Sequence, residues 1–136
     1  MRRIMQQPMV MIGTDGIYLG QKPHPWLYGT FPRVLGKYVR KEKLLSLEKA
    51  ILKMTYLPNK KLGFRDRGAV KENFFADIVI FDPDKIKDCA TYTKPNRYPE
   101  GIEYVLVSGT VVVETGEHSG SLPRRVLFNL AGTFRL

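Results

Sequence analysis

A carboxylate that follows a short apolar run is the first feature of the sequence that could take part in catalysis. Residues 9–13 form the run Met-Val-Met-Ile-Gly, and Thr14, Asp15 and Gly16 follow it directly. A run this short, without polar side chains, favours a strand buried on both faces, as in a parallel sheet. Asp15 would then lie just past the carboxyl end of the strand, where barrel enzymes place their catalytic groups. The alternative interpretation is that Asp15 and Gly16 only form a turn or a helix cap.

The segment that comes next has the composition of a functional loop. Residues 17–30 are rich in glycine, proline and aromatic residues, which favours a long loop of defined shape. His24 lies within it, nine residues after Asp15. A lone histidine is otherwise a common surface or core residue, so His24 by itself does not identify a site.

The sequence contains no recognisable metal-binding motif. Zinc takes three or four protein ligands, and neither the HxH nor the HExxH spacing is present. His24 and His118 are isolated from each other, and the glycines around His118 favour a solvated turn. Cys89 is the single cysteine, so it can form neither an internal disulfide nor a zinc cluster alone, and we interpret it as a partly buried thiol. We therefore assign no metal ligand.

The net charge is uneven along the chain. Residues 1–68 carry 14 lysines and arginines against 4 acidic residues, whereas residues 69–136 carry 8 against 9. A basic half can mark nucleic-acid binding, or its acidic complement can lie in a segment outside the chain. No apolar run approaches the ~20 residues of a membrane span, and no signal-peptide core follows Met1, so a cytoplasmic location is expected.

The hydrophobic period changes from helical to extended near residue 68. Thr30 and Ser46 are candidate N-caps of two helices, and Pro58 stops or kinks the second one. After residue 68 the pattern predicts β-strands, which gives the fold class α/β plus β and two units, residues 1–68 and residues 69–136. A lone strand before the helices would have two unpaired edges and would need neighbours that the chain lacks. The predicted strands cover residues 76–82, 102–107, 111–114 and 125–129, with a turn at residues 108–110.

Several short motifs follow one another in an order that is specific to one enzyme family. They are Ile12–Gly16, His24-Pro25, residues 29–36 (Gly-Thr-Phe-Pro-Arg-Val-Leu-Gly), Lys53-Met54-Thr55, Arg67-Gly68 and residues 76–83 (Ala-Asp-Ile-Val-Ile-Phe-Asp-Pro). In this order they resemble the N-acyl-D-amino-acid deacylases, or D-aminoacylases, of the amidohydrolase superfamily. The resemblance extends over residues 1–128, although the last of these motifs is shared by many amidohydrolases.

The resemblance implies a zinc-dependent hydrolase that cleaves linear amide carbon–nitrogen bonds. The family has a (β/α)8 barrel and a small β-sandwich domain built from both chain ends. Residues 9–14 would then be the last barrel strand, and residues 69–128 the C-terminal share of the β-domain. A whole barrel takes about 250 residues, so most of its strands and their zinc ligands would lie outside these 136 residues. We expect zinc in the intact family and none bound by this chain alone.

The same resemblance assigns roles to four side chains. An aspartate at the position of Asp15 is the general base, which takes a proton from a zinc-bound water and returns it to the leaving amine. His24, Trp26 and Tyr28 would bind the substrate in the loop that shapes its entrance. The family pattern is His-Pro-Arg, with the arginine as a clamp for the substrate carboxylate. Trp26 replaces that arginine with one uncharged N–H donor.

Three hypotheses follow for the function. The chain is part of an enzyme that acts on N-acylated D-amino acids, and it is incomplete and inactive in isolation. Alternatively, it is the non-catalytic subunit of a split amidohydrolase, with an upstream amidohydrolase chain or a second copy as its partner. The third hypothesis is a nucleic-acid-binding protein, motivated by the isoelectric point of about 9.8 but without any RNA- or DNA-binding motif to support it. We expect no membrane partner.

Overall fold

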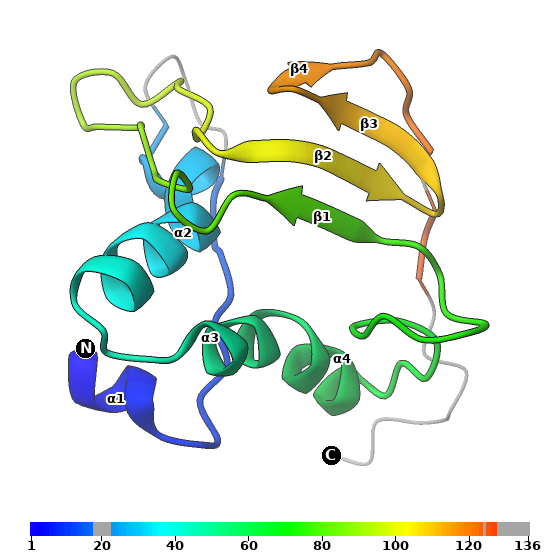
Figure 1. The fold of residues 1–136 in the computed structure, drawn as a ribbon, viewed down its shortest axis with the longest axis horizontal. Coiled ribbons are helices and arrows are strands. Elements are labelled where there is room, and N and C mark those ends of the chain that lie inside the picture. Colours follow the sequence, from blue (N-terminus) through cyan, green and yellow to red (C-terminus); the bar gives the residue numbers. More distant parts are fainter. Residues whose placement is uncertain (18–22, 124, 128–136) are drawn as a thin grey trace.

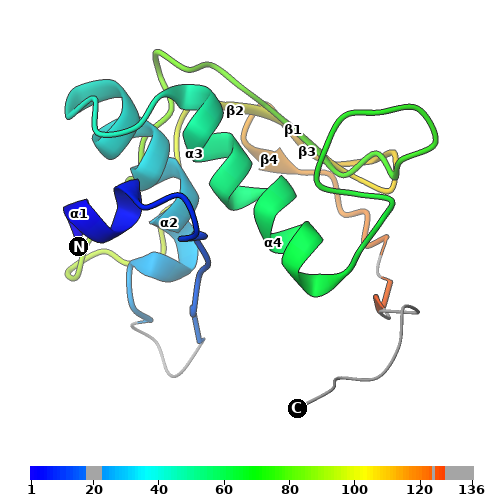
Figure 2. The ribbon, with the colours of Figure 1, turned by 90° about the horizontal axis from the view of Figure 1, so that it is seen from below.

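The computed structural model describes residues 1–17, 23–123 and 125–127, and in this part of the chain a four-stranded sheet faces a set of short helices. Figure 1 shows the sheet along one side of the molecule and helices α3 and α4 along the other, with α2 close to one end of the sheet. Seen from below, α3 and α4 follow one another in a row that runs roughly in the direction of the strands (Figure 2).

The chain begins with helix α1 (Arg2–Gln6) and continues as an irregular segment rather than as the predicted strand. Residues 10–17 pair with no strand of the described chain, because the sheet is formed entirely by later residues. The backbone is held to α3 instead, since the Ile12 N–H donates to the Lys53 carbonyl at 3.0 Å. The strand prediction for residues 9–14 is therefore not met here, for want of a neighbouring strand.

Helix α2 (Trp26–Arg33) begins earlier than the sequence predicted. Pro25 is its N-cap, so Thr30 lies inside the helix and the predicted cap at Thr30 is wrong. The last five residues of the predicted loop, 26–30, are therefore helical. Pro32 lies inside α2 and has no N–H to donate, and the chain continues from Val34 to Lys41 as a π-helix, η1.

Two short helices then follow in succession. Helix α3 (Leu47–Met54) is capped as predicted, because the Ser46 hydroxyl accepts a hydrogen bond from the Lys49 N–H at 3.3 Å. Helix α4 (Tyr56–Leu62) carries Pro58 in its first turn, where a missing N–H costs little. The interruption between α3 and α4 confirms the predicted break near Pro58.

The sheet is fully antiparallel and its strands lie in chain order. The predicted hairpin is confirmed, with Ser108 and Gly109 both at positive φ in its turn. Residues 125–127 are not in a strand, and the rest of the predicted strand 125–129 lies outside the described residues. The strands are β1 (Ile78–Phe81), β2 (Ile102–Val107), β3 (Thr110–Glu114) and β4 (Glu117–His118).

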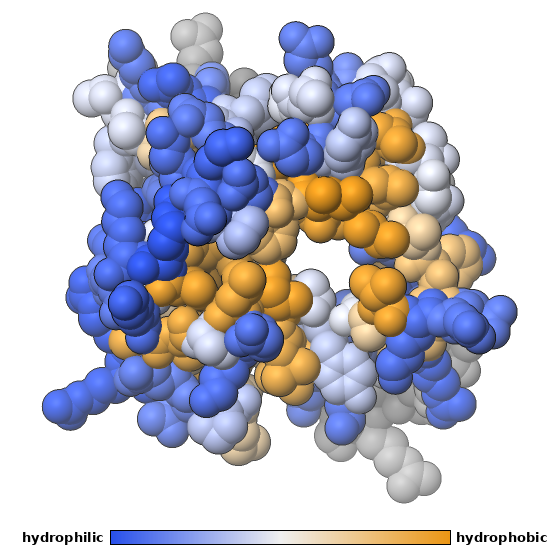
Figure 3. Space-filling view, viewed as in Figure 1, coloured by the Kyte–Doolittle hydropathy of each residue, from blue (hydrophilic) through white to orange (hydrophobic). Residues whose placement is uncertain are grey.

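The hydrophobic core lies where the helices meet the end of the sheet, not beneath the sheet itself. Its buried members are Val34, Leu35, Leu45, Ala50 and Ile86. No strand residue is fully buried, although β1 is a run of four apolar residues and so presents apolar side chains on both faces. Figure 3 shows hydrophobic side chains around an opening between the sheet and the helices opposite it.

Among the described residues, no helix is long and apolar enough to cross a membrane.

Candidate functional site

Asp15 lies on the surface, near the end of the irregular segment that follows α1 and is described as far as residue 17. Gly16, its neighbour, packs tightly against α2. A Cβ atom at Gly16 would come within 2.7 Å of Leu27 Cδ1 and 2.8 Å of Leu27 Cα. A side chain at this position would therefore push the segment away from α2, so glycine is needed for the close approach.

Two threonines attach the same segment to α2. The Thr30 hydroxyl donates to the Trp26 carbonyl at 2.8 Å and lies 3.3 Å from the Thr14 hydroxyl. Thr14 is the residue before Asp15, so the backbone that carries the carboxylate is tied to α2 on both sides, through Thr14 and through Gly16. The carboxylate itself remains exposed and available to a ligand.

His24 has a defined tautomer in this structure. Its Nδ1 accepts a hydrogen bond from the Trp26 N–H at 3.1 Å, so the ring proton of the neutral imidazole is on Nε2. Nε2 lies 3.1 Å from the Tyr92 hydroxyl and can donate to it. The His24 ring also makes edge contacts with the rings of Trp26 and Tyr92, at centroid distances of 4.8 and 5.2 Å. Tyr92 thus belongs to this aromatic cluster, and the sequence analysis did not identify it.

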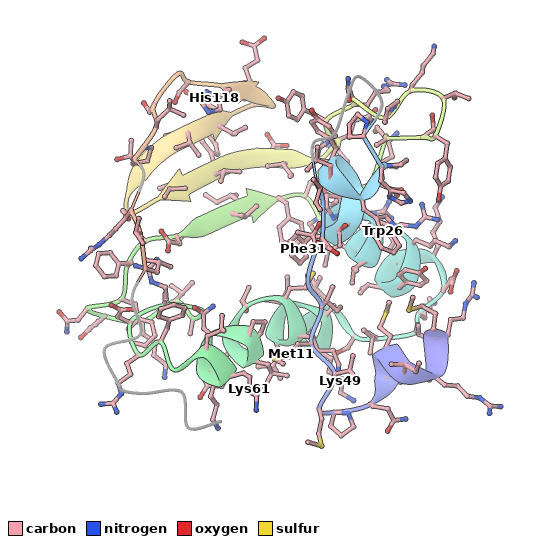
Figure 4. The ribbon with its side chains drawn as sticks, turned by 180° about the vertical axis from the view of Figure 1, so that it is seen from behind. Met11, Trp26, Phe31, Lys49, Lys61 and His118 are labelled. Atoms are coloured by element: carbon pink, nitrogen blue, oxygen red, sulfur yellow. The ribbon has the colours of Figure 1, made fainter. Side chains whose placement is uncertain are left out.

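A hollow of about 410 Å³ lies beside this aromatic cluster, with His24, Trp26 and Tyr92 in its wall. Figure 4 shows Trp26 on the side of α2 that faces away from the sheet. Arg33 and Asp88 also line the hollow, and Arg33 Nη1 donates to Asp88 Oδ2 at 2.7 Å. This hydrogen bond raises the pKa of Arg33 above its usual value, so the guanidinium stays charged.

The four residues singled out from the sequence do not converge on one place in this chain. The structure brings His24 and Trp26 together, whereas neither Asp15 nor Tyr28 belongs to the wall of the hollow. Tyr28 makes an edge contact with Tyr98 instead, at a centroid distance of 5.4 Å. The wall of the hollow thus contains two of the four predicted residues, His24 and Trp26.

A metal site cannot be assembled from the described residues. They contain no group of three histidine, cysteine, aspartate or glutamate side chains close enough to hold an ion. His118 is exposed in the short β4 strand, and its Nδ1 accepts a hydrogen bond from the Gly120 N–H at 2.9 Å. The zinc that the sequence resemblance implies therefore does not fit the donors present in this part of the chain.

Cys89 behaves as a structural thiol, and its environment predicts slow alkylation. Burial raises the pKa of the Cys89 thiol, and the hydrogen bond to Glu100 Oε1 at 3.3 Å raises it further. Removing the Glu100 charge lowers that pKa, so more thiolate is present at a given pH. We expect Glu100→Gln to speed the reaction of Cys89 with iodoacetamide at pH 8 about two- to five-fold, measured by mass spectrometry. An unchanged or slower reaction would contradict this account.

The comparisons with known proteins all indicate the same family. A sequence profile of the amidohydrolase family matches residues 1–113. The N-acyl-D-glutamate deacylase of Alcaligenes xylosoxydans xylosoxydans is 48% identical over a stretch that covers 82% of this chain and 23% of that protein. The D-aminoacylase of the same organism is 42% identical, with coverages of 91% and 26%.

Solved structures agree with the sequence comparison. A D-aminoacylase structure described as having a binuclear metal centre superposes with a TM-score of 0.85 at 43% identity, covering 88% of this chain and 25% of that one. The N-acyl-D-glutamate deacylase of Bordetella bronchiseptica, in complex with zinc and a phosphonate inhibitor, gives 0.80 at 46% identity, with coverages of 82% and 23%. The chain spans about a quarter of the length of these relatives. It belongs to the amidohydrolase family, and its similarity to N-acyl-D-amino-acid deacylases extends over most of its length.

Proposed function

We propose that this chain supplies the last strand and helices of the catalytic barrel, and the C-terminal share of the β-sandwich, of an N-acyl-D-amino-acid deacylase. The main support is that a quarter of a D-aminoacylase superposes on 88% of the chain with a TM-score of 0.85. In this proposal residues 1–68 belong to the barrel and residues 69–136 to the β-domain. Residues 9–14 become a strand only when a neighbouring barrel strand pairs with them.

In the proposed reaction, Asp15 is the group of this chain that moves protons. Its carboxylate accepts a proton from the attacking water as the new carbon–oxygen bond forms at the amide carbon. It then returns that proton to the amine nitrogen as the carbon–nitrogen bond breaks. The exposed position of Asp15 supports this role, because a substrate can reach the carboxylate directly. Since zinc does not fit the donors described here, its ligands would come from a part of the enzyme outside residues 1–136.

His24, Trp26 and Tyr28 would shape the entrance for the N-acylated D-amino acid. The edge contact with Trp26 and the hydrogen bonds to Trp26 N–H and Tyr92 hold the His24 ring in one orientation. Trp26 offers an apolar ring with one N–H donor in the place where the resembling family carries arginine. The chain thus recognises the substrate carboxylate without that charged fork, or through a cation from another part of the enzyme.

A second candidate function is that of a non-catalytic subunit in a split amidohydrolase. The exposure of the sheet favours this function. Every described strand residue is at least partly exposed, although β1 has apolar side chains on both faces. The large exposed side chains that surround the sheet and the facing helices would be covered by a partner chain. They include Leu52, Tyr56, Leu62, Val79 and Ile80.

Complementation tests the proposal directly. The purified chain would be assayed with zinc against a panel of N-acetyl-D-amino acids, alone and after co-expression with a D-aminoacylase that lacks its matching quarter. We expect no turnover by the chain alone and measurable turnover by the complemented pair. The relative's own quarter, expressed as a separate chain, serves as the control for the split itself. If that control is active and the pair with this chain is not, the proposal is wrong.

A further inference from the structure

Lys53 is the one charged side chain that is buried in the described part of the molecule. Only 4% of the surface of Lys53 is exposed. The other two charged residues of α3, Glu48 and Lys49, are exposed. Burying an ammonium group costs free energy unless hydrogen-bond acceptors replace the lost water. The acceptors that surround Lys53 therefore show what the residue does in the fold.

All of the acceptors belong to the segment that leads to Asp15. The Lys53 ammonium donates to the carbonyl of Gln7 and to the carbonyl of Val10, the latter at 2.8 Å. The Lys53 backbone carbonyl also accepts from the Ile12 N–H at 3.0 Å. One residue of α3 thus binds the segment at three successive points, two through its side chain and one through its backbone.

These three contacts fix where the segment lies against α3, and the segment has no strand neighbour among the described residues. Residues 7–9 form a turn, in which the Val10 N–H donates to the Gln7 carbonyl at 3.2 Å, and an irregular stretch leads from there to Asp15. A shift of this segment along α3 would therefore carry Asp15 with it and change the direction of its carboxylate. The side-chain bonds of Lys53 oppose such a shift at the start of the segment, and Thr14 and Gly16 hold its far end against α2.

We propose that Lys53 is a positioning residue, which fixes where residues 7–12 lie against α3 and so the place of the Asp15 carboxylate. The inference rests on the proposed function for its catalytic meaning, but the contacts themselves do not depend on it. Lys53 makes no contact with Asp15 and takes no part in proton transfer. Its charge strengthens two hydrogen bonds to carbonyls that are otherwise left without a donor from α3.

Amide hydrogen exchange on the full chain tests the positioning role and does not require a catalytically active enzyme. Lys53→Met keeps the length of the side chain and removes its donors, Lys53→Arg keeps both charge and donors, and Lys49→Met is the matched control on the exposed side of α3 (Figure 4). In Lys53→Met we expect the Ile12 amide to exchange about ten-fold faster or more, because the segment leaves α3 more often. The exchange rates of the amides in the β2–β3 hairpin should not change in Lys53→Met. Lys49→Met should exchange at Ile12 as the wild type does, and Lys53→Arg should restore most of the protection of that amide.

Two results would overturn the proposal. Unchanged exchange at Ile12 in Lys53→Met would show that the ammonium does not hold the segment. An equal rise in the exchange rates of the hairpin amides would show that Lys53 stabilises the whole fold and not this segment in particular. In the complemented enzyme, Lys53→Met should lower kcat and leave KM unchanged, with recovery in Lys53→Arg. If complementation itself fails, the proposed function falls, whereas the exchange data still decide the role of Lys53.

Discussion

Replacing Asp15 with asparagine is expected to lower the kcat of the complemented enzyme by about 10²–10⁴-fold, the range that a positioned general acid–base group contributes. Asparagine has nearly the same size and shape, so Gly16 can still pack against Leu27 and the backbone stays in place. The amide cannot accept the proton of the attacking water, so the barrier to hydrolysis rises. KM should change little, because the carboxylate acts mainly in the transition state.

The measurement is the steady-state hydrolysis of the preferred N-acetyl-D-amino acid by the two complemented enzymes. Asp84→Asn is the matched control, since Asp84 is also an exposed aspartate and lies in the turn after β1. It should leave both kcat and KM unchanged. Equal activity of Asp15→Asn and the wild type would remove Asp15 from the mechanism, and the complemented barrel would then use a base from the other chain.

The features that were predicted correctly from the sequence depend on neighbours along the chain. The Ser46 cap needs only the N–H of Lys49, three residues away, and the hairpin turn needs only the two residues at positive φ, Ser108 and Gly109. Such interactions are present in the chain whatever surrounds it. The start of α2 at Pro25 was missed because a cap at Thr30 obeys the same local rules equally well.

The features that were missed need partners distant in sequence. The contact between His24 and Tyr92 joins residues 68 positions apart, and no motif connects them. The Lys53 contacts with Gln7 and Val10 are of the same kind, because a helical lysine is normally expected to be solvated. The segment at residues 9–14 has the composition of a buried strand, but a strand forms only against another strand.

The largest effect on stability is expected for a substitution at the contacts of Ile86, where η1 packs against the chain that follows β1. We call this contact region the joint. Two glycines enclose the backbone of Ile86, which is itself 2% exposed. A Cβ atom at Gly36 would lie 2.6 Å from the Ile86 carbonyl oxygen, and one at Gly101 would lie 2.5 Å from the Ile86 nitrogen. Arg40 closes the same joint, since its Nη1 donates to the Ile86 carbonyl at 2.7 Å. The backbone of Ile86 therefore has no room to move away from an added methyl group.

Gly101→Ala should lower the free energy of unfolding by about 2–5 kcal/mol. The backbone at Gly101 has φ +84, which costs an L-residue about 1–2 kcal/mol, and the clash with Ile86 adds the roughly 1–3 kcal/mol of overpacking. Gly109→Ala separates the two contributions, because Gly109 has φ +83 and nothing within 4 Å of its added Cβ. That control should lose only the smaller, conformational part.

Urea unfolding followed by circular dichroism measures both variants against the wild type. A Gly101→Ala loss that exceeds the Gly109→Ala loss gives the free energy of packing at Ile86 by difference. If both variants lose the same free energy of unfolding, the backbone around Ile86 moves to accommodate the methyl group. Ile86 would then not hold the sheet against the helices. The comparison matters for function because η1 and α2 are continuous, so a joint that holds η1 to Ile86 also holds α2, which carries Trp26.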